Sequence, residues 1–186
     1  LGEASRVAFA DRGYYVADPD FVRVPARQML SPDYLKQRAN AIAATKAAAA
    51  EIKPGSFSQN MALGRAVELP STSHLVIVDA AGNVVSMTTS IENAFGSTLM
   101  ANGYLLNNEL TDFSFEPEQN GQAVANRVEG GKRPRSSMAP TIVLKNGAPY
   151  LAVGSPGGSR IIGYVAKTLV AHLDWGMDIQ QAIDLP

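Results

Sequence analysis

The chain has 186 residues, a formal net charge of −1 and 46% hydrophobic residues, a balance typical of a globular protein that buries a core. The small net charge gives no broad attraction to nucleic acid or to an anionic membrane, and the absence of cysteine excludes disulfides and cysteine nucleophiles. No apolar run reaches about eighteen residues, so we expect no membrane span. His74 and His172 are far apart and indicate no metal cluster, and we expect no cofactor.

The N-terminal part is expected to form helices followed by a connector. Residues 3–12 combine good helix formers with apolar residues on one face. Ser31 and Pro32 supply an N-cap and a first-turn proline for a second helix, which we expect to run to about Glu51. The second half of this helix is rich in alanine, which favours a helix but offers little bulk for packing. Residues 56–71 are polar and irregular, as is typical of a flexible connector.

The character of the sequence changes at His74, where β-branched and apolar runs alternate with turn residues. Two hairpins are predicted, one turning at Ala81-Gly82-Asn83 and one at Asn146-Gly147, because such pairs favour tight hairpin turns. The expected strands are residues 74–79, 83–90, 104–106, 141–144 and 150–153. A charged loop is expected at 116–132.

The C-terminal part is expected to be helical. Residues 159–173 predict an amphipathic helix, and Asp178 is expected to cap a last helix. The face of the first of these helices is predicted to consist of Ile161, Val165, Leu169 and Leu173. Because strands are followed by helices without regular βαβ alternation, the sequence favours a layered α+β sandwich.

Thr72 lies where the connector meets the first strand, and its surroundings allow two interpretations. A threonine hydroxyl is a poor nucleophile, but a free α-amino group on the same residue can accept its proton. That amine exists only if the Ser71–Thr72 peptide bond is broken. The alternative is that Thr72 simply begins a strand, where β-branched residues are common.

The segment 154–158, Gly-Ser-Pro-Gly-Gly, lies between a predicted strand and a predicted helix. Backbone N–H groups in such a turn can face a reacting oxygen, and the helix N-terminus adds positive partial charge. An ordinary tight turn is the alternative. A phosphate-binding loop is disfavoured, because its lysine and hydroxyl residues are missing.

Two further segments carry groups suited to a charged ligand. Ser136 and Ser137 follow a basic, proline-containing stretch and can donate hydrogen bonds to a carboxylate. Glu109 and Asp112, three residues apart, can flank an ammonium group. Each segment is also compatible with an ordinary solvated loop.

The motifs and their order resemble those of one known family. They are Thr72-Ser73-His74, Ser90-Ile91-Glu92-Asn93-Ala94-Phe95-Gly96, Leu105-Leu106-Asn107-Asn108-Glu109-Leu110-Thr111-Asp112-Phe113, Lys132-Arg133-Pro134-Arg135-Ser136-Ser137-Met138 and Gly154-Ser155-Pro156-Gly157-Gly158. In this order they resemble the γ-glutamyltranspeptidases (glutathione hydrolases) of the N-terminal-nucleophile hydrolase superfamily. Ala8-Phe9-Ala10-Asp11-Arg12 and Asp18-Pro19-Asp20-Phe21-Val22 resemble the end of that family's large subunit.

The resemblance implies a precursor that cuts itself between Ser71 and Thr72. Thr72 then attacks the γ-carbonyl of a donor such as glutathione, and water or an amino acid or peptide acceptor receives the γ-glutamyl group. The N–H groups of Gly157 and Gly158 match the family's oxyanion hole. Ser90 lies where a hydroxyl residue contacts the nucleophile and assists processing.

The resemblance also implies how the substrate is held. Ser136 and Ser137 match the pair that binds the donor's α-carboxylate. Glu92, Glu109 and Asp112 match positions around its α-ammonium group. The implied fold is α+β, a four-layer αββα sandwich.

The family's organisation divides the chain at the predicted cleavage point. Residues 1–71 correspond to the C-terminal helical part and linker of the large subunit, and residues 72–186 to a small catalytic subunit truncated at its C-terminus. We therefore expect the rest of the large subunit to be a partner and the sandwich to be incomplete here. The resemblance implies a periplasmic or extracellular location, with no nucleic acid partner.

The sequence departs from the family's pattern at three positions. Ser73 stands where many relatives have threonine, and Glu92 and Glu109 stand where some relatives have amides. A cephalosporin acylase-like enzyme or a poly-γ-glutamate-processing enzyme could carry similar motifs in place of a glutathione hydrolase. A catalytically silent fragment with a structural role is a third possibility, since truncation alone could silence the chain.

Overall fold

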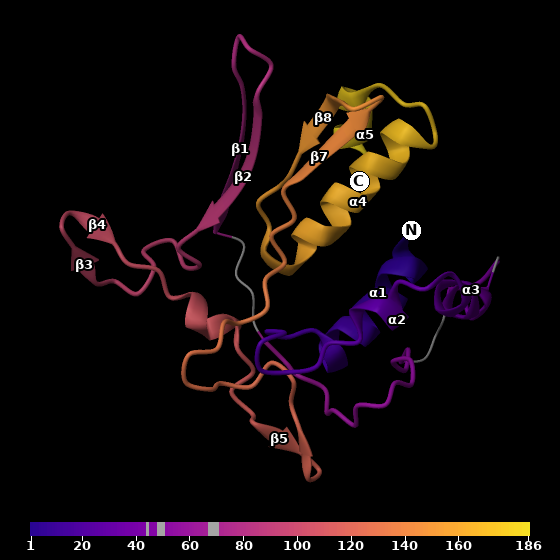
Figure 1. Ribbon diagram of the computed structural model, residues 1–186, viewed down its shortest axis with the longest axis vertical. Coiled ribbons are helices and arrows are strands. Elements are labelled where there is room, and N and C mark those ends of the chain that lie inside the picture. The colour runs from indigo at the N-terminus through magenta and orange to yellow at the C-terminus, as the bar shows by residue number, and fades with distance from the viewer. Residues whose placement is uncertain (44, 48–50, 67–70) are drawn as a thin grey trace. The chain divides into compact units, whose positions relative to one another are not determined.

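The computed structural model of the chain describes residues 1–43, 45–47, 51–66 and 71–186 (Figure 1). The chain divides into two compact units. Unit 1 comprises Leu1–Val67 and Leu110–Arg135, and unit 2 comprises Glu68–Glu109 and Ser136–Pro186. Unit 1 thus combines residues from both sides of Thr72. Among the described residues, no helix has both the length and the apolar character needed to cross a membrane.

Unit 1 begins with three helices, α1 (Gly2–Tyr15), α2 (Ala26–Met29) and α3 (Pro32–Asn40). The predicted first helix is confirmed, whereas α2 was not predicted. The predicted cap of α3 is also confirmed, because Ser31 Oγ accepts a hydrogen bond of 3.4 Å from the Tyr34 N–H.

The predicted extension of the second helix to about Glu51 is wrong. The helix α3 ends at Asn40, and residues 41–43 and 45–47 are not helical, while residues 44 and 48–50 lie outside the described part. Helical propensity alone seldom sustains a short helix in water, and alanine side chains supply little apolar surface for tertiary packing. The intrinsic preference of these alanines was therefore insufficient.

The core of unit 1 joins residues distant in sequence. Its buried apolar residues are Val7, Tyr15, Ala17, Val22, Ala62, Phe113, Val124 and Ala125. Ala62 forms a parallel bridge with Val124, and its N–H donates to the Ala123 carbonyl at 3.0 Å. This part of the expected connector is thus anchored by pairing with the later chain; residues 67–70 of the connector lie outside the described residues.

The expected loop at 116–132 contains regular structure that was not predicted. Two short strands, β5 (Glu118–Gln119) and β6 (Gln122–Ala123), form an antiparallel pair within it. Strands of two residues leave almost no periodic signal in a sequence, so a loop was the natural expectation.

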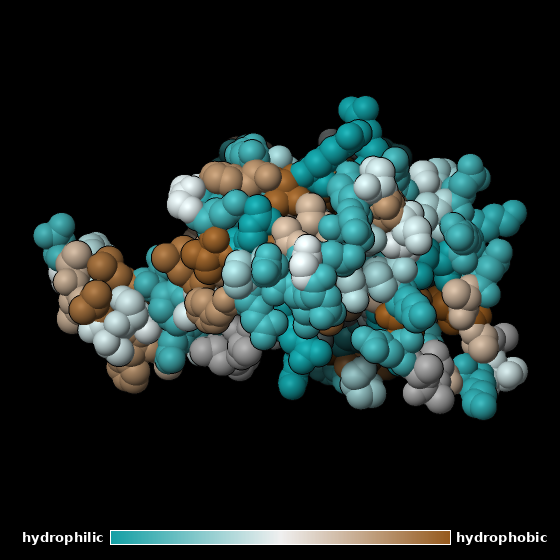
Figure 2. Space-filling model, turned by 90° about the horizontal axis from the view of Figure 1, so that it is seen from below, coloured by the Kyte–Doolittle hydropathy of each residue, from teal (hydrophilic) through white to brown (hydrophobic). Residues whose placement is uncertain are grey.

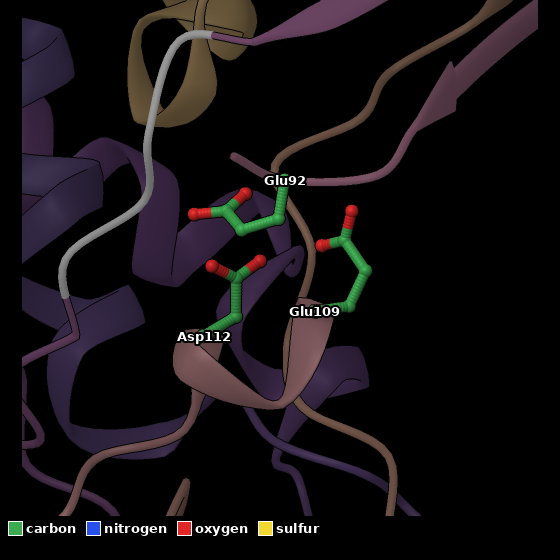
Figure 3. Close-up of side chains that lie close together, drawn as sticks. All are labelled: Glu92, Glu109 and Asp112. Atoms are coloured by element: carbon green, nitrogen blue, oxygen red, sulfur yellow. The ribbon is translucent and has the colours of Figure 1, made fainter. Parts of the chain in front are cut away.

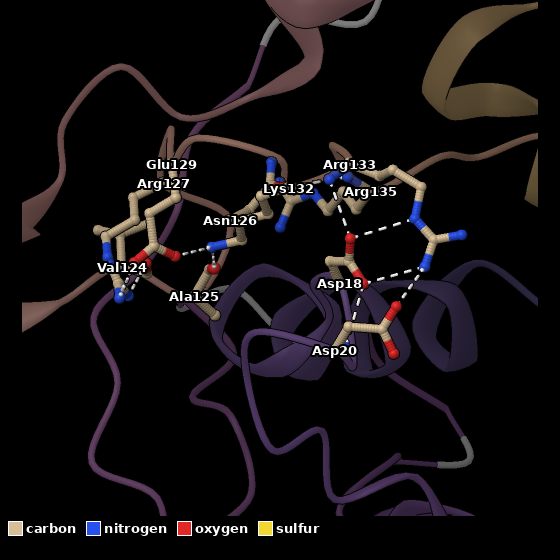
Figure 4. A network of polar contacts seen from close by, with 10 residues as sticks. All are labelled: Asp18, Asp20, Val124, Ala125, Asn126, Arg127, Glu129, Lys132, Arg133 and Arg135. Atoms are coloured by element: carbon tan, nitrogen blue, oxygen red, sulfur yellow. Dashed lines mark hydrogen bonds and ion pairs between the residues drawn. The ribbon is translucent and has the colours of Figure 1, made fainter.

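The basic stretch before Ser136 is bound to the rest of unit 1 (Figure 4). Asp18 accepts hydrogen bonds from the backbone N–H, Nε and Nη2 of Arg133 at 2.9, 3.1 and 3.1 Å. Lys132 Nζ donates to the Ala125 carbonyl at 2.7 Å, and Arg135 donates to the Gly64 carbonyl at 3.1 Å. The three cations of the basic stretch, Lys132, Arg133 and Arg135, are thus bound by groups of the protein itself.

Unit 2 is built from antiparallel hairpins. The long hairpin consists of β1 (Thr72–Val78) and β2 (Val84–Ser90), and a second consists of β7 (Thr141–Lys145) and β8 (Ala148–Val153). Both were predicted and both are confirmed. A short pair, β3 (Met100–Ala101) and β4 (Tyr104–Leu105), lies between them in sequence, and only β4 was predicted.

Two helices complete unit 2, α4 (Ile161–Leu173) and α5 (Ile179–Asp184), and both were predicted. The one-turn helix η2 (Gly158–Arg160) leads into α4. Asp178 caps α5 as expected, accepting the Gln180 N–H at 2.9 Å. In Figure 1, α4 runs beside the β7–β8 hairpin. The ring of Tyr150 in β8 stacks on the ring of His172 in α4.

The predicted apolar face of α4 is only partly correct. Ile161 and Val165 are buried, but Leu173 is 47% exposed. The buried stripe continues instead through Thr168 and Ala171. Side-chain size did not decide which residues are covered, because burial follows the neighbouring elements.

Large apolar side chains remain exposed along the β1–β2 hairpin. They include Leu75, Val76, Ile77, Val78, Val85 and Met87. On the face of the molecule drawn in Figure 2, apolar residues likewise lie at the surface among polar ones. The helices and antiparallel hairpins establish an α+β chain, in which the described strands pair two by two.

Candidate active site

Thr72 and Ser90 face each other at the open end of the long hairpin. Thr72 begins β1, Ser90 ends β2, and the antiparallel register pairs them directly. The Thr72 hydroxyl donates to Ser90 Oγ at 3.3 Å, and Ser90 Oγ donates to the carbonyl oxygen of Ser71 at 3.4 Å. The Ser90 hydroxyl therefore contacts both the proposed nucleophile and the carbonyl of the predicted cleavage site.

The bonding capacity of the Ser90 hydroxyl matches these contacts. Ser90 Oγ also accepts the Glu92 N–H at 2.9 Å, so it accepts two hydrogen bonds and donates one. A serine hydroxyl has one proton and two lone pairs, so all three contacts can form together. The hydrogen bond to the Ser71 carbonyl oxygen polarises the C=O bond and makes the carbonyl carbon more electrophilic.

Glu92 lies close to Glu109 because two asparagines join their loops. The Asn93 N–H donates to Asn108 Oδ1 at 2.9 Å, and the Asn108 N–H donates to the Ile91 carbonyl at 3.2 Å. A carboxylate oxygen of Glu92 lies within 4.8 Å of one of Glu109. Glu92 is buried, and its backbone φ of 70° lies in the left-handed region, which non-glycine residues adopt uncommonly.

Asp112 is placed beside Glu109 by the one-turn helix η1 (Glu109–Asp112). Carboxylate oxygens of these two residues also lie within 4.8 Å of one another, and Figure 3 shows the side chains of Glu92, Glu109 and Asp112. Carboxylates at this spacing attract a positive charge, which lowers their mutual repulsion. An ammonium group meets that requirement, and a hard metal cation such as Ca²⁺ also uses carboxylate ligands.

The turn from β8 to α4 depends on its glycines. Gly157 has a φ of 134° and Gly158 a φ of 57°, which L side chains rarely adopt. A Cβ on Gly157 would also lie 2.9 Å from Tyr164 Cε2. The turn therefore favours glycine at both positions. The role of their N–H groups as an oxyanion hole stays a prediction.

The two serines of the predicted carboxylate subsite differ in environment. Ser137 is buried, whereas Ser136 is exposed and its Oγ accepts the Met138 N–H at 3.1 Å. The Ser136 hydroxyl proton is not used in that bond and remains available to an incoming acceptor. Their role in binding a substrate likewise stays a prediction.

From the sequence, His74 was assigned no catalytic or binding role of its own, yet it lies next to the candidate nucleophile Thr72 and to the glycine turn. It shares a strand face with Thr72, since residues two apart on a strand point the same way. Its ring lies against the backbone of Gly154, the first residue of the glycine turn. The position of His74, two residues after Thr72, was the available signal in the sequence. Its contact could not be predicted, because Gly154 is distant in sequence.

Comparison with known proteins agrees with the order of motifs in this chain. The family model described as Gamma-glutamyltranspeptidase matches residues 1–186. The glutathione hydrolase proenzyme of Bacillus subtilis (strain 168) is 41% identical over 198 aligned residues. That alignment covers 100% of this chain and 32% of the relative, so the chain spans about a third of the relative's length.

Solved structures show the same relationship. The γ-glutamyltranspeptidase of Pseudomonas nitroreducens complexed with L-DON is 39% identical with a TM-score of 0.54, covering 60% of this chain and 62% of that one. The cephalosporin acylase of Bacillus halodurans is 26% identical with a TM-score of 0.74, covering 99% of this chain and 31% of that one. With a family match over every residue, the chain belongs to the γ-glutamyltranspeptidase family.

Proposed function

We propose that this chain carries the nucleophile and much of the substrate pocket of an enzyme that hydrolyses or transfers γ-glutamyl groups. The observation that carries the proposal is the contact of Ser90 Oγ with both Thr72 Oγ1 and the Ser71 carbonyl oxygen. The motifs around it match the family, and a relative at 41% identity is named a glutathione hydrolase proenzyme.

The first proposed step is cleavage of the chain before Thr72. The Thr72 hydroxyl adds to the carbonyl carbon of Ser71, and its proton passes to the departing nitrogen of Thr72 as the amide C–N bond breaks. An ester joins Ser71 to Thr72 Oγ1, and water hydrolyses that ester. The products are a carboxylate on Ser71 and a free α-amino group on Thr72. Ser90 supports this step by donating to the Ser71 oxygen, where negative charge develops.

The second proposed step is turnover of a γ-glutamyl donor such as glutathione. The α-amine of Thr72 takes the proton of its own hydroxyl, which attacks the γ-carbonyl carbon. The N–H groups of Gly157 and Gly158 stabilise the resulting oxyanion. The leaving amine takes the proton, and an ester of the γ-glutamyl group on Thr72 remains. Water, or the amine of an amino acid or peptide, then releases that group.

The proposed pocket holds both charges of the donor's α-carbon. Ser136 and Ser137 donate to the α-carboxylate, and Glu92, Glu109 and Asp112 attract the α-ammonium group. Fixing two opposite charges orients the γ-carbonyl toward the nucleophile and reduces the entropy lost at the transition state. We propose that the remainder of the large subunit completes this pocket as a partner.

The same proposal covers fold, organisation and location. Residues 1–71 and 72–186 are proposed to be parts of the large and small subunits, within an αββα sandwich to which this chain contributes only some layers. The exposed apolar side chains of the β1–β2 hairpin support further layers, because such faces are normally covered. A periplasmic or extracellular location is proposed from the family alone.

An acylase is the second candidate, favoured by the TM-score of 0.74 to the Bacillus halodurans cephalosporin acylase. The acids around Glu92 argue against it, because they suit a substrate with a free α-amino group. Turnover of γ-glutamyl and glutaryl anilides distinguishes the two enzymes, since only the γ-glutamyl substrate carries an ammonium group. A γ-glutamyl enzyme should prefer the first substrate and an acylase the second. Release of glutamate from poly-γ-glutamate would instead identify a polymer-processing enzyme, and a chain that turns over none of these substrates would be a silent fragment.

The decisive experiment is to compare the purified chain with its Thr72→Ala variant. Intact mass should show two pieces for the parent, the second with Thr-Ser-His at its N-terminus, and one uncut piece for the variant. Turnover of γ-glutamyl-p-nitroanilide should be lost with the cleavage. The control, Ser73→Ala, should still cut and turn over. Cleavage in Thr72→Ala, or an uncut parent without turnover, would overturn the proposal.

A further inference from the structure

His74 and Gly154 make a close contact within unit 2 that the proposed mechanism does not use. A Cβ placed on Gly154 would overlap three atoms of the His74 ring, Cε1, Nδ1 and Nε2, the last at 2.6 Å. Gly154 does not have a positive φ, unlike Gly157 and Gly158, so its backbone would suit other residues. The ring of His74 is therefore the nearest obstacle to a side chain at Gly154.

The ring of His74 is also held from its own hairpin. His74 pairs with Thr88 in the β1–β2 register, and Nδ1 lies 2.9 Å from Thr88 Oγ1. The other ring nitrogen, Nε2, is buried without a hydrogen-bond partner among the described residues. A buried polar atom without a partner costs free energy, so the position of the ring is not explained by hydrogen bonding alone.

One face of the long hairpin connects the nucleophile to the glycine turn. Thr72 and Ser90 form one cross-strand pair on this face, and His74 and Thr88 form the next. Further along the same face, Ser86 Oγ donates to the carbonyl of Val153, the residue before Gly154, at 3.3 Å. The face that presents Thr72 thus packs, through His74, on the start of the turn that carries Gly157 and Gly158.

We propose that His74 is a positioning residue, whose ring against Gly154 fixes the 154–158 turn relative to the strand that carries Thr72. This inference rests on the proposed function, because it assigns to the contact the spacing between nucleophile and oxyanion hole. A shift of the turn would move its N–H groups away from the developing oxyanion while leaving the groups that bind the α-carbon in place. The effect therefore falls on kcat and not on KM.

The test is a double-mutant cycle in the full chain, measured with γ-glutamyl-p-nitroanilide. Gly154→Ala should lower kcat by about tenfold or more with KM within about twofold, because the new methyl group displaces the turn. His74→Ala removes the ring and should lower kcat by a smaller factor. In the double variant the methyl group occupies space that the ring has vacated, so kcat should exceed that of Gly154→Ala alone.

A matched glycine provides the control. A Cβ on Gly163, in α4, would meet nothing within 4 Å, so Gly163→Ala should keep the parent kcat. Circular dichroism melts identify any variant that fails to fold, and the double variant should melt above Gly154→Ala. A double variant as slow as Gly154→Ala, in an active parent, would refute the positioning role alone. A parent without turnover would refute the proposed function and this inference with it.

Discussion

The contacts that stabilise unit 1 internally differ in kind from those that stabilise unit 2. Unit 1 buries charged and polar side chains against partners distant in sequence, as with Asp18 and Arg133, or Arg135 and the Gly64 carbonyl. Unit 2 relies on hairpin pairing and leaves side chains such as Val78 62% exposed. The difference teaches that Thr72, the proposed nucleophile, is placed by local register, while the stretch leading to Ser136 and Ser137 is anchored by polar contacts with residues distant in sequence.

The buried core of unit 1 gives the largest expected effect. Phe113 is 2% exposed and Phe115, two residues later, is 71% exposed. Phe113→Ala should lower the free energy of unfolding by about 3–5 kcal/mol, because it leaves a cavity. Phe115→Ala should change it by about 0.5 kcal/mol or less. Urea denaturation followed by circular dichroism measures both, and equal effects would contradict the contrast in burial.

The ion pair of Asp18 with Arg133 gives an intermediate effect that depends on pH. Hydrogen bonds from the Arg133 side chain, and then from its backbone N–H, lower the pKa of Asp18 below its usual range. A carboxyl whose folded pKa is lowered stabilises the fold above its unfolded pKa of about 3.9 and loses that contribution as pH falls. Asp18→Asn should therefore lower the thermal midpoint at neutral pH and flatten its decline below about pH 4.

Asp20 provides the matched control for this ion pair. Its carboxylate accepts a hydrogen bond from Nη2 of Arg133 at 3.1 Å, and its side chain is 75% exposed. Asp20→Asn should lower the thermal midpoint less than Asp18→Asn, since exposed pairs are weak and screened by salt. If the two variants melted alike at every pH, the Asp18 contacts would not be the ones that matter.

The exposed hairpin of unit 2 gives the smallest expected effect. Val78→Thr on β1 should change the free energy of unfolding by about 0.5 kcal/mol or less, because the side chain is 62% exposed. The same change at Val165, which is 5% exposed in α4, should cost about 1–3 kcal/mol by burying a hydroxyl. A large loss at Val78, measured by urea denaturation, would show that another surface covers the hairpin in solution.

Local signals account for the elements that were predicted correctly. The caps at Ser31 and Asp178 and the turn at Asn146-Gly147 depend on residues a few positions apart. The end of α3 at Asn40 and the bridge between Ala62 and Val124 depend on what packs nearby in space. No local preference encodes those contacts, so sequence patterns extended the helix too far and described the connector as irregular.

In the candidate site, too, some features were predicted from the sequence and others were seen only in the structure. The sequence identified Thr72, Ser90 and the three acids as candidates, and the hairpin register explains why Thr72 and Ser90 meet. Their catalytic and binding roles stay predictions. The contact of His74 with Gly154 was not predicted, because it joins two segments that lie far apart in the sequence.

By itself, the sequence determined the hairpins, the capped helices, the chemical groups of the site and the family to which the chain belongs. Short-range turn, capping and pairing preferences are enough for the first two, and the order of motifs is enough for the rest. Only the tertiary structure decided that Arg133 and Arg135 bind the protein and that His74 lies against Gly154. Those contacts form because buried polar groups and close-packed rings take partners by proximity in space, which a linear pattern does not record.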